Sequence, residues 1–242
     1  MPDLLFVVLV FLCASVVHAI AGFGAGLVAM SLLVMQWPVA RAVGVCSVCT
    51  LLLNFWMAWQ LRRDINWSEL GPMVLATLIG VPLGVTALHS LPEEWIIGGL
   101  GVLLILHSTR GLLLGDAAVS QVGRAWGFLA GLFGGLLGGA FNTSGPPVII
   151  YGTARGWEKD RFRATLQIYF IVTGVLAVVL YVGTGVVSMT SLPWSVLAIP
   201  VMAIGAAIGQ RLVARISAAR FRILVFVGLE VTGAYYIWRV IF

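Results

Sequence analysis

The stretch Gly-Gly-Ala-Phe-Asn-Thr-Ser-Gly-Pro-Pro at residues 138–147 interrupts an apolar segment that runs over 125–151. Asn, Thr and Ser are residues that cap helices, and Pro suits a first helical turn because its missing N–H would have no partner there anyway. The stretch therefore predicts a break followed by a new helix near 146–152. A glycine-rich sequence, Gly-Phe-Gly-Ala-Gly at 22–26, breaks the apolar segment 4–35 in a similar way.

The two breaks open halves of similar layout. Each broken segment is followed by three ordinary apolar segments. Matched landmarks recur in both halves: Arg41-Ala42 with Arg163-Ala164, and Gly80 and Gly84 with Gly205 and Gly209. The pattern predicts an internal duplication, with a first membrane repeat at 1–115, a connecting loop at 116–124 and a second membrane repeat at 125–242.

Composition places the chain in a membrane. Of its 242 residues 61% are hydrophobic and 10% are charged, and the mean hydropathy is +1.07, whereas roughly a quarter of the residues of a soluble domain are charged. Most of the apolar segments have close to the ~20 residues that cross a hydrocarbon core. The segment 4–35 would make a helix of about 48 Å at ~1.5 Å per residue, which is longer than the core is thick. The eight segments are 4–35, 42–60, 70–89, 95–115, 125–151, 165–187, 193–210 and 223–238.

The basic residues between these segments indicate the topology. If all eight segments crossed the membrane, Arg62 and Arg63 would lie opposite the basic clusters of the second half, against the positive-inside rule. If the first segment of each half dips in and returns to its own side, these arginines share the cytoplasmic side with both clusters. Inverted repeats with discontinuous helices are a common transporter design. We therefore expect an all-α membrane protein of two inverted repeats, each with one broken, re-entrant helical segment and three transmembrane helices.

Half-helix ends that meet near the middle of a membrane would form an anion site. A helix N-terminus presents free amides and the positive end of the helix dipole, and glycine lets backbone amides approach a ligand. A small oxyanion would then need no buried Lys or Arg. The alternative is that the glycines serve only close helix packing. The candidate binding residues at the two breaks are Gly22, Phe23, Gly24, Gly26, Asn142, Thr143, Ser144 and Gly145.

Polar residues inside apolar segments normally face the protein interior, because they are expensive in lipid. His18 precedes Gly22 by four residues and is a candidate proton carrier or anion ligand, with a hydrogen-bonded structural role left open. Gln167 shares a helix face with Arg163 and is a candidate substrate ligand. Asn54 is a further candidate for lining the path; polar packing contacts are the alternative for both amides.

Three charged residues are candidates for the pathway or for coupling. Glu230 lies near the middle of the last apolar segment, where either proton coupling or an interhelical ion pair would explain it. Arg41 and Arg163, at matching positions of the two halves, are candidates for the mouths of the pathway. Anchoring at the membrane interface is the alternative for both arginines.

No metal, nucleotide or organic cofactor is indicated, since the sequence has neither a P-loop nor a dinucleotide fingerprint. Cys46 and Cys49 have the spacing of a redox or zinc pair but lie in an apolar segment without a second ligand pair, which favours helix packing. The net charge of +5 indicates orientation in the membrane rather than a nucleic-acid partner. The chain start has no basic n-region, so we expect no removable signal peptide. A homo-oligomer is left open.

The paired breaks, the Gly-Gly-Ala-Phe-Asn-Thr-Ser-Gly-Pro-Pro stretch and the later Arg-Phe-Arg-Ala-Thr at 161–165 resemble the sulfite exporter TauE/SafE family of membrane transporters. The resemblance extends over nearly the whole chain. It implies the movement of sulfur-containing anions, such as sulfite, sulfoacetate and related organosulfonates, across the bacterial inner membrane. This substrate class agrees with the anion-favouring helix ends.

The resulting expectation is a multi-pass inner-membrane transporter, and not an enzyme. It would export sulfite or an organosulfonate bound at the midplane between the two broken helices, with coupling to the proton gradient. A passive anion channel stays open, because the same site would serve either mode. An intramembrane serine hydrolase would use Ser144 with a histidine base. Against it, Asn142 stands two residues before Ser144, where a nucleophile motif would have glycine.

Overall fold

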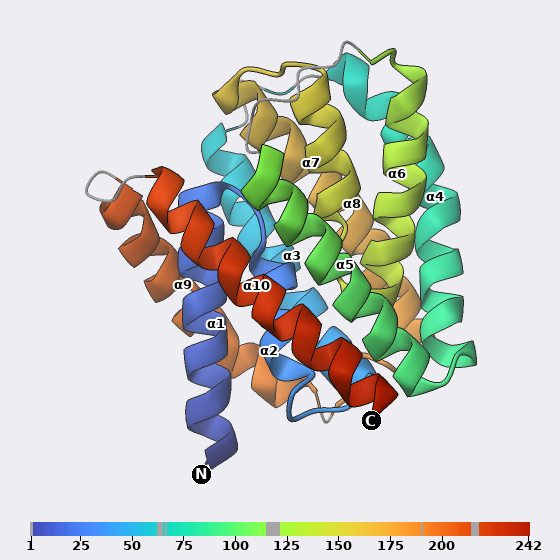
Figure 1. The fold of residues 1–242 in the computed structure, drawn as a ribbon, viewed down its shortest axis with the longest axis vertical. Coiled ribbons are helices and arrows are strands. Elements are labelled where there is room, and N and C mark those ends of the chain that lie inside the picture. Colours follow the sequence, from blue (N-terminus) through green and yellow to red (C-terminus); the bar gives the residue numbers. More distant parts are fainter. Residues whose placement is uncertain (1, 62–64, 66, 115–121, 190, 214–217) are drawn as a thin grey trace.

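The computed structural model describes residues 2–61, 65, 67–114, 122–189, 191–213 and 218–242, and these residues form ten α-helices (Figure 1). The all-α fold class is thereby confirmed. Residues 116–121 of the expected connecting loop lie outside the described residues. The helices are α1 (Pro2–Ala21), α2 (Ala25–Leu33), α3 (Val39–Leu61), α4 (Trp67–Ser90), α5 (Glu93–Leu114), α6 (Ala125–Phe141), α7 (Gly145–Ala154), α8 (Lys159–Gly183), α9 (Leu192–Val213) and α10 (Ala218–Ile241).

The ten helices form two sets of five in the same order. Each set begins with two helices separated by a short break and continues with three helices of at least 22 residues. Figure 1 shows that each helix of the first set runs in the opposite direction to its counterpart in the second: α1 runs up the view and α6 runs down, and α5 runs up and α10 runs down. This arrangement is that of an inverted repeat.

The first apolar segment of each half turns back at its break. α2 packs against α1, and α7 packs against α6. In Figure 1, α3 and α8 then start at opposite ends of the molecule, near the ends from which α1 and α6 began. By length and composition α1, α3, α4, α5, α8 and α9 could each cross a membrane, and α6 is a shorter apolar helix. These spans and the returning α2 and α7 agree with a multi-pass membrane protein that has re-entrant segments.

The break in the first half is formed by glycines in the left-handed backbone region. Gly22 has φ of 85° and Gly24 has φ of 97°, a conformation that glycine adopts without steric penalty because it lacks Cβ. Gly24 is the N-cap of α2, and its carbonyl accepts the first bond of that helix, from the Val28 N–H at 2.9 Å. The glycines therefore allow the chain to reverse between α1 and α2.

The break in the second half uses a different device. Asn142 adopts φ of 53° and ends α6, and the N–H of Thr143 donates to the Leu137 carbonyl at 3.3 Å. The N–H of Asn142 itself donates to the Gly138 carbonyl at 2.9 Å, which is the αL type of helix C-cap, with asparagine in the left-handed position that glycine usually fills. The predicted helix near 146–152 is confirmed as α7. However, Ser144 caps α7 without a side-chain hydrogen bond, so the polar triplet ends α6 more than it begins α7.

The two halves are interlocked by matched glycines. α4 packs along α6, and α9 packs along α1, so the fourth helix of each half lies on the first helix of the other. A Cβ added to Gly84 would lie 2.1 Å from the Leu136 carbonyl oxygen, and one added to Gly209 would lie 2.8 Å from the Val16 carbonyl oxygen. The glycines that the sequence predicted to be equivalent thus have the same structural role in each half. They permit close backbone approach, as small residues do in membranes.

Candidate functional site

The two breaks touch each other inside the molecule. A Cβ added to Gly26 in α2 would lie 2.3 Å from the carbonyl oxygen of Asn142, so only glycine fits this contact. The Asn142 side chain continues across to α3, where its Nδ2 donates to Thr50 Oγ1 at 3.0 Å. The structure therefore brings together two sequences that are more than a hundred residues apart.

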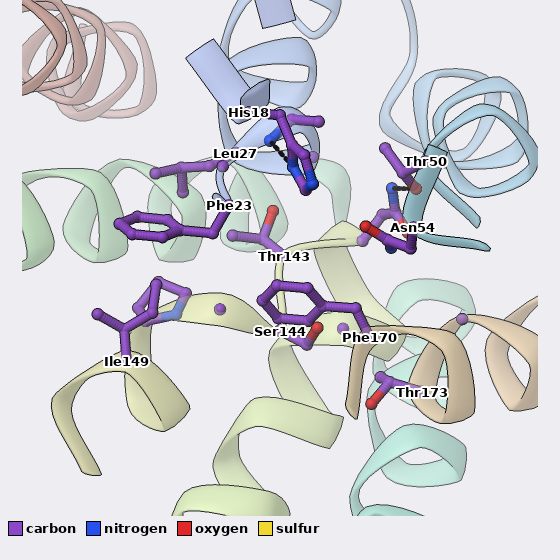
Figure 2. A pocket seen from close by; sticks show the side chains of 18 of the residues that line it. His18, Phe23, Leu27, Thr50, Asn54, Thr143, Ser144, Ile149, Phe170 and Thr173 are labelled. Carbon is purple, nitrogen blue, oxygen red and sulfur yellow. Dashed lines mark hydrogen bonds between the residues drawn. The ribbon is translucent and has the colours of Figure 1, made fainter. Parts of the chain in front are cut away.

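A pocket lies at this junction (Figure 2). Its lining includes residues of α1, α2, α3, α5, α6, α7 and α8 together with both breaks. Figure 2 shows His18, Leu27 and Phe23 on one side and Ser144, Ile149 and Phe170 on the other, with Thr143 between them. Among the described residues, the lining contains no Lys, Arg, Asp or Glu. Of the predicted binding and pathway residues, the pocket is lined by His18, Phe23, Gly24, Gly26, Asn54, Asn142, Thr143, Ser144 and Gly145.

The number of free backbone N–H groups differs between the N-termini of α2 and α7, which both lie at the pocket. In α2 the amides of Ala25, Gly26 and Leu27 precede the first intrahelical bond, which the Val28 N–H makes. In α7 the second and third positions are prolines, which carry no N–H, so Gly145 holds the one amide among the first three positions. The α2 end is consequently the richer donor. At the α7 end, the Thr143 and Ser144 hydroxyls add polar groups to the lining.

His18 and Gln167 support the first break. The Ala25 N–H points at His18 Nδ1 at 3.4 Å, and Gln167 Nε2 lies 3.4 Å from His18 Nε2 and donates to the Gly22 carbonyl at 2.7 Å. A neutral imidazole has one acceptor nitrogen, so His18 accepts from only one of these two donors in either tautomer. Gln167 is fully buried but does not line the pocket itself. It holds the backbone of Gly22, which is likewise outside the lining.

The two matched arginines lie in different surroundings. Arg163 is half-buried beside the first break: its Nη2 donates to the Ala19 carbonyl near the end of α1 at 3.3 Å, and a Cβ added to Gly22 would lie 2.8 Å from its Nε. Arg41 is exposed, with its guanidinium 4.1 Å from the centre of the Trp37 ring and 5.5 Å from that of Trp194. Neither lines the pocket. Arg163 is the nearer of the two to the candidate site.

Glu230 and Asn54 also differ from each other in position. Glu230 lies outside the pocket lining and joins α10 to α5: its carboxylate accepts from the Ser108 hydroxyl and from Thr109 Oγ1, the latter at 2.9 Å. Among the described residues no ion pair involves Glu230, so the interhelical contact it makes there is to hydroxyls. Asn54 lines the pocket, and its buried Oδ1 has no hydrogen-bond partner.

Several lining residues were not anticipated from sequence. Thr50, Thr173 and His107 contribute polar groups, and Ile149 and Phe170 contribute apolar surface. His107 lies close to the end of an apolar segment, a position that predicts a histidine at the membrane interface. Thr50 and Thr173 carry no signal, because threonine is common in helices.

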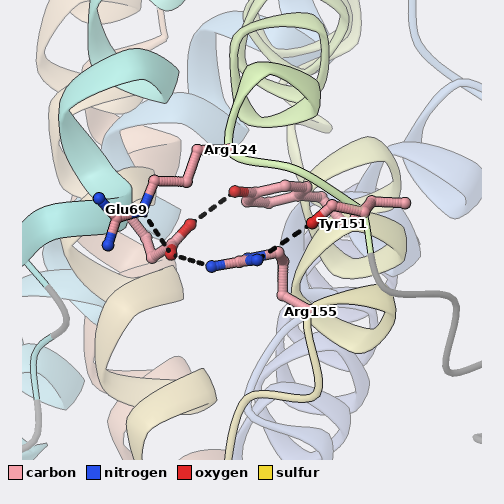
Figure 3. A network of polar contacts seen from close by, with 5 residues as sticks. Glu69, Arg124, Tyr151 and Arg155 are labelled. Carbon is pink, nitrogen blue, oxygen red and sulfur yellow. Dashed lines mark hydrogen bonds and ion pairs between the residues drawn. The ribbon is translucent and has the colours of Figure 1, made fainter.

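A second polar cluster closes one end of the molecule (Figure 3). Glu69, at the start of α4, is 4% exposed and accepts a hydrogen bond from Tyr151 in α7 at 2.5 Å and one from Arg155 Nη2 at 2.6 Å. Arg155 Nη1 donates to the Val122 carbonyl at 3.0 Å, and the exposed Arg124 approaches the same carboxylate at 3.5 Å. The hydrogen bond to Glu69 raises the pKa of Arg155 above its usual value, so the guanidinium stays charged. This Glu69 cluster ties the returning helix α7 to α4.

The family model described as sulfite exporter TauE/SafE matches residues 7–236. The chain belongs to this family. The family assignment confirms the resemblance seen in the break sequences, and it identifies the molecule as a member of a family of membrane transporters.

Two curated relatives of this TauE/SafE protein are similar over most of their length. "Probable sulfite/organosulfonate exporter TauE" of Cupriavidus necator is 27% identical over 226 residues, which cover 90% of this chain and 87% of the relative. "Probable inner membrane transporter protein TsaS" of Comamonas testosteroni is 27% identical over 185 residues, 73% of this chain and 76% of the relative. The expected multi-pass inner-membrane location agrees with these names and with the membrane-spanning helices. No solved structure matches the chain significantly.

Proposed function

We propose that this protein exports a small sulfur-containing oxyanion, such as sulfite or an organosulfonate, and binds it in the pocket between the two breaks. The observation that carries the proposal is the meeting of two helix breaks, from oppositely directed halves, around one pocket whose described lining has no Lys, Arg, Asp or Glu. Helix starts and neutral donors suit an anion, because they supply positive potential without a fixed charge that would hold the anion too tightly to be released. The relatives' names supply the substrate class.

The proposed ligands are the Gly26 and Leu27 amides at the start of α2, the Gly145 amide, and the side chains of Asn142, Thr143 and Ser144. Phe23, Gly22, Gly24 and Gly26 shape the first break around the substrate. Gln167 acts through Gly22, since its Nε2 donates to the Gly22 carbonyl at 2.7 Å. His18, Asn54, Arg41, Arg163 and Glu230 remain candidates for the path or for coupling.

We propose transport by movement of one repeat, 1–115, against the other, 125–242, with energy from the proton gradient. The inverted arrangement of the halves supports this mechanism, because an inverted pair can exchange roles about a site between them. We favour a transporter over an intramembrane serine hydrolase. Among the described residues, no hydrogen bond joins Ser144 to a histidine, which an activated serine would need.

The test is the flux of radiolabelled sulfite in proteoliposomes, with and without an imposed proton gradient, for the wild type and for the Asn142→Ala/Ser144→Ala double variant. We expect saturable, gradient-sensitive flux that falls by about 100-fold or more in the double variant, because it removes two hydrogen bonds to a charged group, which contribute about 1.5–3 kcal/mol each. Thr184→Ala, which removes an exposed hydroxyl outside the lining, serves as the matched control.

The same measurement separates the alternatives. Flux that neither saturates nor responds to the gradient would indicate a passive anion channel. Sulfite flux that is equal in the wild type and the double variant would place the substrate elsewhere. If sulfite does not move at all, the assay is repeated with sulfoacetate, and failure with both anions would refute the proposed substrate class.

A further inference from the structure

Two histidines line the pocket, and their ring nitrogens are in opposite situations. His18 has a protein neighbour at each nitrogen, the Ala25 amide and Gln167 Nε2. His107, in α5, is 6% exposed, and both of its ring nitrogens are buried without a hydrogen-bond partner. The pocket therefore has one histidine engaged by the protein and one with free hydrogen-bonding capacity.

The ring of His107 is held by packing rather than by hydrogen bonds. Phe226 of α10 lies edge to face against it, with ring centroids 5.5 Å apart. The Phe226 ring occupies a notch at Gly111, one helical turn after His107, where an added Cβ would lie 2.3 Å from Phe226. The imidazole is thus fixed in place while its nitrogens are left unused.

Glu230, the acidic side chain bonded to neighbouring residues of α5, does not satisfy the imidazole. Glu230 is directed to the two residues after His107, the hydroxyls of Ser108 and Thr109, and is not among the pocket-lining residues. A buried N–H without a partner is unfavourable by an amount comparable to a lost hydrogen bond, and such groups in native proteins are few. The arrangement is explained if the partner of His107 is a molecule that enters the pocket.

We propose that His107 is a substrate ligand: its ring N–H donates a hydrogen bond to an oxygen of the transported anion. This inference rests on the proposed function and adds a donor from α5 to the groups at the two breaks. It gives the site a side-chain donor on a helix that belongs to neither broken segment. In the second half, α10 contributes Phe226, which positions the His107 ring from outside the lining.

The experiment measures sulfite binding to the purified full-length protein in detergent, by titration calorimetry and by the melting temperature with and without sulfite. His107→Leu has similar volume and no ring nitrogen, and His107→Gln keeps an N–H donor. His89→Leu, an exposed histidine in α4 outside the lining, is the control. We expect His107→Leu to weaken sulfite binding by about 10-fold or more. We expect His107→Gln to bind more tightly than His107→Leu, and the control to match the wild type.

The ligand-free melting temperature distinguishes a ligand from a structural residue. Because His107→Leu removes buried unpaired nitrogens, we expect its ligand-free protein to melt no lower than the wild type. Wild-type sulfite affinity in His107→Leu would overturn the inference. So would weaker binding together with a lower ligand-free melting temperature, since the imidazole would then support the fold. If the wild type binds no sulfite, the same titrations are made with sulfoacetate, and a wild type that binds neither anion would refute the proposed function and this inference with it.

Discussion

Asn142 combines two roles in one residue, since its backbone ends α6 and its side chain reaches α3. Its φ of 53° lies in the left-handed region, and its Nδ2 donates to Thr50 Oγ1. Asparagine tolerates this conformation better than alanine and other residues with aliphatic side chains, and glycine tolerates it best. The backbone requirement and the side-chain contact can therefore be separated by substitution.

We expect Asn142→Ala to be less stable than Asn142→Gly by about 1 kcal/mol, because alanine is strained in the left-handed region and glycine is not. Both variants lose the same hydrogen bond to Thr50, so the difference between them reports the backbone alone. The measurement is the unfolding midpoint of the two purified variants in the same detergent. Equal midpoints would show that the break relaxes to another conformation.

The candidate site was predictable from sequence where the backbone imposes the residue type. Glycines at 22 and 24 and the prolines at 146 and 147 mark the breaks, because few other residues suit those positions. His107 was not predictable as a lining residue, since its place in the lining depends on how α5 packs in the folded molecule. Gln167 was predicted to face the path but holds the Gly22 carbonyl, a contact across 145 positions of the chain.

At the scale of helices, the interlocking of the halves depends on close backbone contact. Gly84 of α4 meets the Leu136 carbonyl of α6, and Gly209 of α9 meets the Val16 carbonyl of α1. The repetition of these glycines was visible in the sequence. The pairing of α4 with α6 was not, because a small-residue face on one helix does not say which helix covers it.

Gly84→Leu should destabilise the protein by about 1–3 kcal/mol or more, because the new side chain meets backbone that can yield only if α4 and α6 separate. Gly71→Ala, in the same helix but with open space around the added Cβ, is the control and should leave stability unchanged or raise it by up to about 1 kcal/mol. Thermal unfolding in detergent measures both. A Gly84→Leu variant that melts with the wild type would show that the α4–α6 contact is looser than the structure indicates.

At the scale of the whole molecule, the two ends are held by different chemistry. The Glu69 cluster, with a buried carboxylate, joins α4 and α7 at one end (Figure 3). At the other end Trp37, Arg41 and Trp194 form a cation–π group at the starts of α3 and α9. The two groups lie at corresponding positions in the two repeats. The repeats therefore share their helix arrangement, but different side-chain contacts stabilise it in each.

Glu69→Gln should lower stability by about 2–3 kcal/mol, because it removes the buried partner of the Arg155 guanidinium, which is itself 28% exposed. Arg41→Gln should have a smaller effect of about 0.5–1 kcal/mol, since its cation–π contacts are exposed. The two unfolding midpoints, measured side by side, test this order. If Arg41→Gln were the more destabilising change, the cation–π group would contribute more to stability than the Glu69 cluster.

The packing of α1 on α9 and of α6 on α4 also bears on how the chain is made. A ribosome releases α1 first and α9 only after about 170 further residues, so the face of α1 that meets Gly205 and Gly209 stays uncovered in the membrane for most of synthesis. The face of α4 that packs on α6 likewise stays uncovered until α6 has been synthesised. Neither half acquires all of its neighbours before the other is inserted, so assembly is completed only when the last helices enter the membrane. A stalled or truncated chain therefore leaves the close-packing surfaces of the first half without their partner helices.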